Sequence, residues 1–275
     1  MAFLRRIAAL TGILSLAFAA AAVMPADANH SWGKYHWART ANPFTLQLGD
    51  NMDTSWDSYL ATASADWSTA GPFDFGNGST GDASNNPLRT QIVTGSTTGT
   101  DCKPRSGTVQ ACNAAYGTNG WLGLAQIWIT RGSHIAQGTA KMNDSYFSTA
   151  KYDNANEKLH VVCQEVAHTF GLNHQSEDGS SQNSCMDYFS NTGTNAGSTL
   201  STHPNQHDYD QLAKIYSHSD RFSTPASGST GGTPAVFVNG HAPDGTPNGA
   251  SAASGHWYIE PLGGGEFLVT HVHWQ

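Results

Sequence analysis

The segment "LHVVCQEVAHTFGLNHQ", Leu159 to Gln175, decides which fold this chain adopts. At about 100° per residue its apolar residues gather on one side of a helix, whereas Gln164 and His168 lie one turn apart on the opposite side. Gly171 permits the left-handed turn that ends a helix. We therefore predict a two-sided helix, with an apolar side for the core and a polar side for another purpose.

The polar side has the spacing of a metal site. Two ligands at positions i and i+4 of a helix, here Gln164 and His168, can hold one zinc ion from the same side. The chain can fold back after Gly171 and bring His174 to the same ion, while Glu165 can activate a bound water. The alternative is an amphipathic helix that carries these polar residues by chance.

The downstream stretch "NSCMDYF", Asn183 to Phe189, favours the metal site. Together with Q-E-x-x-H-x-x-G-x-x-H, it resembles the metzincin zinc metalloproteases, and most closely the matrixin-like secreted members from bacteria. In that family a methionine turn lies beneath the zinc, and Met186 matches it. Tyr188 matches a tyrosine that lies near the metal in some members. The resemblance extends over about residues 43–218 and is strong only from the helix motif to this turn.

The resemblance implies an α+β fold: a metzincin-like catalytic domain with a twisted mixed sheet, an active-site helix, a methionine turn and a C-terminal helix. The stretch "GWLGLAQIWI" resembles the edge strand of the family's sheet. An extended peptide substrate pairs with that strand by β-augmentation. We expect Gly123, Leu124 and Ala125 to lie at this substrate-binding edge.

The same resemblance implies a zinc-dependent endopeptidase that acts on an extended peptide or an unfolded protein. Zinc would be held by Gln164, His168 and His174, and Glu165 would be the general base. Tyr188 would donate a hydrogen bond to the developing oxyanion. A packed aromatic residue with a satisfied hydroxyl is the alternative for Tyr188.

Gln164 departs from the family pattern, which has a histidine at this position. A neutral amide oxygen is a weaker zinc ligand than an imidazole. Two hypotheses therefore stand: an active secreted endopeptidase with an unusual ligand set, or a metzincin-like secreted binding protein that has lost catalysis. The presence of Glu165 favours the first, because a purely structural metal site needs no base.

The N-terminal residues have the pattern of a secretory signal peptide. Arg5 and Arg6 precede an apolar run, and small residues follow at Ala26-Asp27-Ala28. We predict a signal peptide over residues 1–28, a secreted mature protein and no membrane span in it. The chain has 13 Lys and Arg against 21 Asp and Glu, and no basic patch, so we expect no nucleic-acid partner. We expect a monomer.

An exported chain with an even number of cysteines is expected to form disulfides. The four cysteines permit three pairings, of which we favour Cys102 with Cys112 and Cys163 with Cys185. The second bridge would join the metal helix to the methionine turn.

Composition divides the mature chain into three parts. We predict the metzincin-like domain over residues 29–222, a flexible linker over 223–234 and a small β-rich segment over 235–275 that leans on the domain. Within that segment, His271 and His273 alternate along a strand candidate. Alternating histidines in a strand usually face solvent, so we expect both at the surface. If His168 and His174 do not hold the metal, His271 and His273 are the next candidates.

Further elements follow from local patterns. Strands are expected at residues 43–50, 89–95, 124–130 and 134–142. Helices are expected at 55–70, 154–171 and 207–218, the second with Asn154 and Glu157 spaced as in a capping box.

Overall fold

The computed structural model describes residues 30–130, 132–226, 246–247, 250–251 and 255–275. The predicted signal peptide and most of the predicted linker lie outside these residues. The secondary-structure elements, in chain order, are β1 (His36–Trp37), β2 (Phe44–Asn51), α1 (Asp57–Trp67), β3 (Pro72–Asp74), β4 (Thr80–Asp82), β5 (Leu88–Thr94), η1 (Gly99–Asp101), β6 (Thr108–Ala114), β7 (Trp121–Thr130), β8 (His134–Asn143), α2 (Asp144–Phe147), α3 (Ala155–His168), η2 (Gly193–Asn195), α4 (Gln206–Ile215), β9 (Trp257–Gly263) and β10 (Glu266–Trp274).

One large mixed sheet forms the centre of the molecule. Its strands follow the order β5-β2-β6-β8-β7-β10-β9, and the short β1 pairs with the beginning of β8. The pairs among β5, β2, β6 and β8 are parallel, whereas β8–β7, β7–β10 and β10–β9 are antiparallel. The mixed α+β class predicted from the sequence is confirmed.

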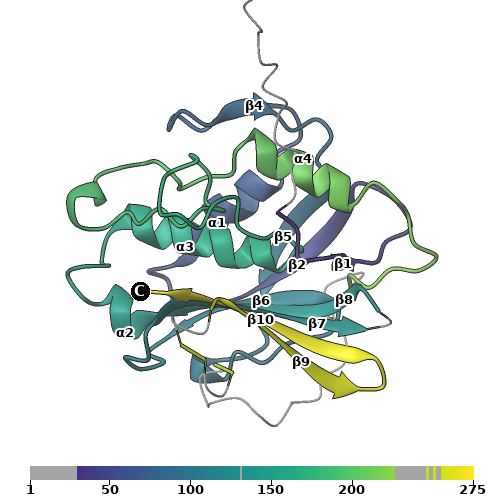
Figure 1. Cartoon of the computed structure of the whole chain (residues 1–275). Helices are drawn as coiled ribbons and strands as arrows, with labels where there is room; N and C mark the ends of the chain where they lie inside the picture. The colour runs from purple at the N-terminus through teal and green to yellow at the C-terminus, as the bar shows by residue number, and fades with distance from the viewer. Residues whose placement is uncertain (1–29, 131, 227–245, 248–249, 252–254) are drawn as a thin grey trace, which may run out of the picture.

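The helices α1, α3 and α4 lie on one face of this sheet (Figure 1). The layer between sheet and helices contains fully buried aromatic side chains such as Trp37, Trp56 and Trp67. Each such side chain removes about 150–250 Å² from water, so these residues dominate the stability of this layer. The Trp67 indole also donates to the Cys163 carbonyl, which joins α1 to α3.

Helix α3, Ala155–His168, lies within the range predicted from the sequence, residues 154–171. The Asn154 side chain accepts from the Glu157 amide and caps its first turn. The Glu157 carboxylate does not return to close a capping box, because it accepts from the Asn191 amide instead. At the other end Gly171 has φ 94°, and a Cβ there would lie 2.3 Å from the Tyr35 carbonyl oxygen.

Every residue of α3 from His160 onward is buried, including those on its polar side. The polar side of the helix, for which the sequence predicts a metal site, is therefore covered in this structure. The cause is the C-terminal hairpin of β9 and β10, drawn in yellow in Figure 1, which adds two strands to the main sheet.

The hairpin corrects two predictions. Residues 257–274 do not form an appendage that leans on the sheet, because β10 is hydrogen-bonded into it along β7. Strand β7 is therefore not an edge strand in this structure. The substrate-binding residues predicted from the sequence are paired with the chain's own C-terminal strand: Gly123 with His273, Leu124 with Val272 and Ala125 with His271.

The structure contains the two disulfides predicted from the sequence, Cys102–Cys112 and Cys163–Cys185. None of the helices in the described part of the chain combines the length and the hydrophobicity that a membrane crossing requires.

Candidate metal centre

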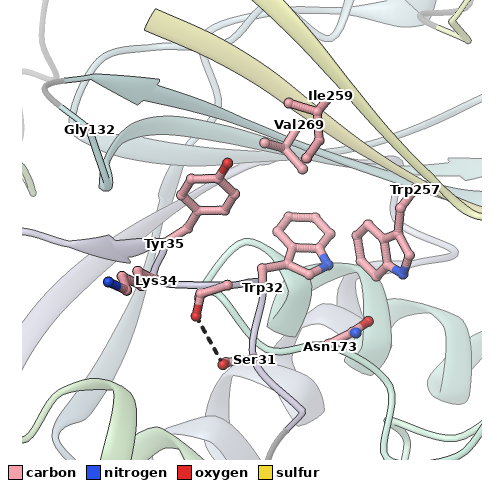
Figure 2. Close-up of a pocket in the computed structure, with 10 residues that line it drawn as sticks. Ser31, Trp32, Lys34, Tyr35, Gly132, Asn173, Trp257, Ile259 and Val269 are labelled. Atoms are coloured by element: carbon pink, nitrogen blue, oxygen red, sulfur yellow. Dashed lines mark hydrogen bonds between the residues drawn. The ribbon is translucent and has the colours of Figure 1, made fainter. Parts of the chain in front are cut away.

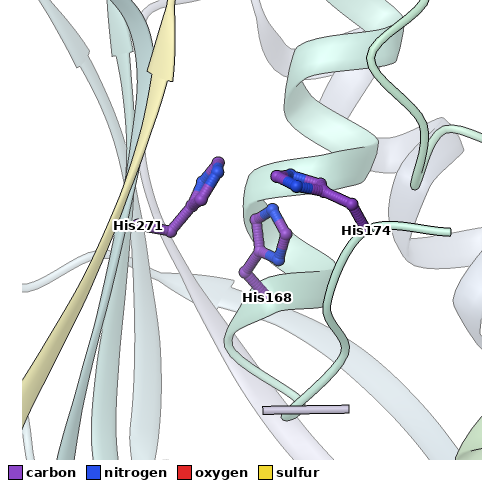
Figure 3. Close-up of side chains that lie close together, drawn as sticks. All are labelled: His168, His174 and His271. Atoms are coloured by element: carbon purple, nitrogen blue, oxygen red, sulfur yellow. The ribbon is translucent and has the colours of Figure 1, made fainter. Parts of the chain in front are cut away.

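Three histidines from distant parts of the chain meet between α3 and β10. His168 ends α3, His174 follows in the loop after Gly171, and His271 comes from β10 (Figure 3). One ring nitrogen of each lies within 4.8 Å of the others, and all three side chains are buried. We call His168, His174 and His271 the inner cluster.

The hydrogen bonds of two of these rings orient them for metal binding. The Nδ1 of His168 lies 2.9 Å from the Leu172 carbonyl, and the Nδ1 of His174 lies 3.0 Å from a Glu177 carboxylate oxygen. Each acceptor fixes the proton on Nδ1 and leaves Nε2 with a free lone pair. Both Nε2 atoms are buried without a hydrogen-bond partner, which is costly unless a further group binds there.

The electrostatics keep these rings neutral. Burial lowers the pKa of His168, His174 and His271 well below the usual histidine value, and neighbouring histidines lower it further. Neutral imidazole is the form that binds a metal ion. Three neutral rings with converging nitrogens therefore fit a divalent cation.

Glu165 lies against this cluster, and its carboxyl group has His271 and His273, whose pKa values are lowered by burial, as neighbours. Its Oε2 is 3.4 Å from the Nδ1 of His271, and its Oε1 is buried without a hydrogen bond. Burial raises the pKa of Glu165 well above its usual range. A Cβ on Gly123 would lie 2.6 Å from Oε1, so the carboxyl group fits there only because β7 has a glycine at this point.

Gln164 has three hydrogen bonds in this structure. Its amide nitrogen donates to the carbonyls of Cys185 and Asp187, both at 2.9 Å, and its Oε1 lies 2.5 Å from the Nδ1 of His273. The side chain thus links α3 to the methionine turn and to β10. Its role as a zinc ligand stays a prediction.

The segment around Met186, the predicted methionine turn, lies next to α3, and its place beneath a zinc ion stays a prediction. Met186 is fully buried, and the Cys163–Cys185 disulfide joins the helix to the preceding residue of the turn. His160, one turn before Gln164, is no candidate ligand, because both of its ring nitrogens have partners.

Tyr188 faces the inner cluster. Its ring centroid is 4.5 Å from that of His174, and its hydroxyl lies 3.5 Å from the Nε2 of His271. The hydroxyl also forms a short hydrogen bond with the Nδ1 of His256. Burial raises the pKa of Tyr188 above its usual value, so the hydroxyl keeps its proton and can donate.

The expectation that His271 and His273 face solvent is wrong. His271 is fully buried in the inner cluster, and His273 is buried against Gln164. His256, the partner of Tyr188, was also missed. The only signal in the sequence was the alternation of His271 and His273, which places both on one side of a strand. The pattern could not show that this side faces α3.

An apolar pocket of about 400 Å³ opens beside the inner cluster (Figure 2). Trp32 stacks on His168 with ring centroids 5.4 Å apart, and Trp257 meets His168 edge-on at 5.2 Å. Ile259 and Val269 of the hairpin complete the wall opposite Tyr35. This pocket exists only while the hairpin lies on β7, since β9 and β10 supply several of its walls.

Comparison with models of known protein families and with curated proteins found no match to this chain. The relationship to metzincins therefore stays a proposal that rests on the sequence motifs and on the arrangement described above.

Proposed function

We propose that this protein is an exported zinc-dependent endopeptidase of metzincin type, whose active site is covered by its own strand β10. The observation that carries the proposal is the convergence of His168, His174 and His271 beside Glu165. Unlike the Glu177 oxygen that orients His174, Oε1 of Glu165 has no hydrogen bond, so this carboxyl group is available to act on a water at the metal. The two disulfides support export, because such bonds persist in oxidising compartments.

The residues of the site would have separate roles in catalysis. His168 and His174, with His271 in the covered form, would hold zinc. When bound, zinc would polarise the scissile carbonyl and lower the pKa of the attacking water. Glu165 would take the proton from that water and pass it to the leaving amine. Tyr188 would donate its hydroxyl proton in a hydrogen bond to the developing oxyanion.

Substrate would bind where β10 now lies. β7 offers the hydrogen bonds of a strand to β10, and an extended peptide or a segment of an unfolded protein could accept the same pairing. Departure of β10 would remove His271 from the cluster. It would also release the Gln164 oxygen from His273, so this oxygen would become available to zinc.

The second candidate is a secreted binding protein that holds zinc without catalysis. It is favoured by the same hairpin, since Glu165 is fully buried and β7 has a strand on each side. The two candidates differ in what happens once β10 is removed.

The test compares the intact mature chain with a chain that ends at Ala226 and lacks the hairpin. Both are loaded with zinc, checked for folding by circular dichroism and incubated with an unfolded protein substrate. We expect hydrolysis by the shortened chain and little by the intact one. Glu165→Gln in the shortened chain should lower hydrolysis about 10²- to 10⁴-fold, because the variant keeps the shape of the side chain and loses the base.

Each other outcome has a definite meaning. A shortened chain that folds, holds zinc and leaves the substrate intact would support the binding protein. A shortened chain that loses both zinc and the activity of the intact chain would show that His271 belongs to the working site. Equal hydrolysis by Glu165→Gln would refute the assigned base.

A further inference from the structure

A second group of metal-binding side chains lies away from the inner cluster, where β1 meets β8. His36 and His134 stand opposite each other in the parallel pairing of these strands. Asp220, in the segment after α4, completes a set whose ligand atoms lie within 4.8 Å of one another. The Nε2 of His134 is 3.2 Å from one Asp220 oxygen, and the Nε2 of His36 is 3.6 Å from the other.

His218 adds a fourth candidate ligand from the same segment as Asp220. Its Nε2 lies 3.1 Å from the Nε2 of His36 and 3.7 Å from an Asp220 oxygen. Zinc binds nitrogen and oxygen at about 2.0–2.2 Å, so two ligand atoms of a tetrahedral site are about 3.3–3.5 Å apart. With Oδ1 of Asp220 as the carboxylate ligand, the distances from Oδ1 to His134 and to His218 and the distance between His36 and His218 are 3.1–3.7 Å, around this value. His218 lies outside the set whose ligand atoms are all within 4.8 Å of one another, so its half-exposed ring would turn toward the ion.

One ring of this group is already oriented for a metal. The Nδ1 of His36 lies 2.7 Å from the Lys34 carbonyl, so it carries the proton and Nε2 points into the group with a lone pair. A cavity of about 410 Å³ borders His36 and His218, and half of the His218 side chain is exposed. An ion can therefore enter from solvent.

The competing explanation is an ion pair without a metal. Arg39 is buried and places a guanidinium nitrogen 2.8 Å from Oδ2 of Asp220. This contact uses one carboxylate oxygen and leaves Oδ1, which faces His134 and His218. Arg39 also donates to the carbonyls of Tyr216 and His218, so it shapes the segment as well as balancing the charge of Asp220.

We propose that His36, His134, His218 and Asp220 bind a second zinc ion, separate from the inner cluster. Four protein ligands leave no open position, which is the composition of a structural zinc site. The ion would fasten the segment after α4 to β1 and β8. Backbone hydrogen bonds from Asp220 to Arg39 and from Thr224 to Ala38 already lay this segment along the chain that follows β1. We call these four residues the outer cluster.

The test counts zinc ions in the intact mature chain after exposure to a graded chelator. Wild type should hold two ions and His134→Ala one. His203→Ala is the matched control: His203 also pairs with a carboxylate, Asp66, and its side chain is as exposed as that of His134, 17% in each case. It lies in neither cluster, so His203→Ala should retain two ions.

A second variant, at an exposed ligand, tests the same site with less risk of misfolding. His218→Ala alters a half-exposed side chain, so the fold should survive, and retention of the second ion should weaken at least about tenfold. The proposal is overturned if wild type holds only one ion and His134→Ala still holds it; a single ion that His134→Ala loses would instead count against the inner cluster. It is also overturned if His134→Ala and His218→Ala retain zinc as well as His203→Ala does.

Discussion

The inner and outer clusters contain the same kind of ligand but differ in where they place the carboxylate. In the outer cluster Asp220 is one of the candidate ligands, and Arg39 balances its charge. In the inner cluster all three candidate ligands are neutral rings, and Glu165 lies beside them with an unpartnered oxygen. A carboxylate among the ligands completes a closed structural site, whereas a carboxylate beside them remains free to move a proton.

The clusters also differ in burial. The inner cluster is fully enclosed between α3 and β10, whereas the outer one reaches the surface at His218. A structural ion needs no access once it is bound. A peptidase centre needs access for substrate, so the proposed peptidase function requires β10 to separate from β7.

The largest expected effect separates the two clusters by metal content. His168→Ala should remove the inner ion from the intact chain and abolish hydrolysis by the chain that ends at Ala226, because it deletes a ligand at the end of α3. The outer ion should stay, so the zinc content should fall from two ions to one. Elemental analysis of the purified variant gives this number. Two ions in His168→Ala would mean that the inner cluster does not hold zinc through this ring.

A smaller effect distinguishes a ligand from its neighbour on β10. His271→Ala should weaken zinc retention in the intact chain by about tenfold or more, because it removes one of three imidazoles. His273→Ala is the comparison on the same strand: it leaves the three rings of the inner cluster in place and frees the Gln164 oxygen, so zinc retention should not fall. Competition with a chelator at one pH measures both. Equal retention in the two variants would remove His271 from the ligand set.

The smallest expected effect on zinc affinity comes from a residue that orients a ligand by a hydrogen bond. Glu177 holds the Nδ1 of His174, and the loss of such a partner typically weakens metal binding about 10- to 100-fold. Because half of the Glu177 side chain is exposed, the low end is expected for Glu177→Ala. The outer ion should not respond, because its oriented ring, His36, is held by a main-chain carbonyl. A matching loss at both sites would indicate general unfolding.

The two clusters also show what the sequence could and could not predict. His168 and His174 were found because both belong to one helix and the turn that follows it, where spacing determines position. The limits of α3 and both disulfides followed from similarly local signals. His271 was considered only as a second choice of ligand and was expected at the surface, because its position depends on the strand with which β10 pairs, and no local spacing determines that pairing.

The outer cluster could be predicted from local spacing least of all. His36, His134 and Asp220 come from β1, β8 and the segment after α4, and no spacing in the chain relates them. Only the parallel pairing of β1 with β8 brings two of them together. Gln164 illustrates a further limit: its residue type suggested a weak ligand, while its hydrogen bonds to the methionine turn and His273 appear only in three dimensions.

The central claim is that His168, His174 and His271 hold one metal ion in the intact chain. Anomalous diffraction at the zinc absorption edge, from crystals of the zinc-loaded mature protein, tests it most directly. We predict a peak about 2.0–2.1 Å from one ring nitrogen of each histidine. A zinc ion bound by His168, His174 and the Gln164 oxygen, with His271 turned away, would contradict it, as would the absence of any peak between α3 and β10.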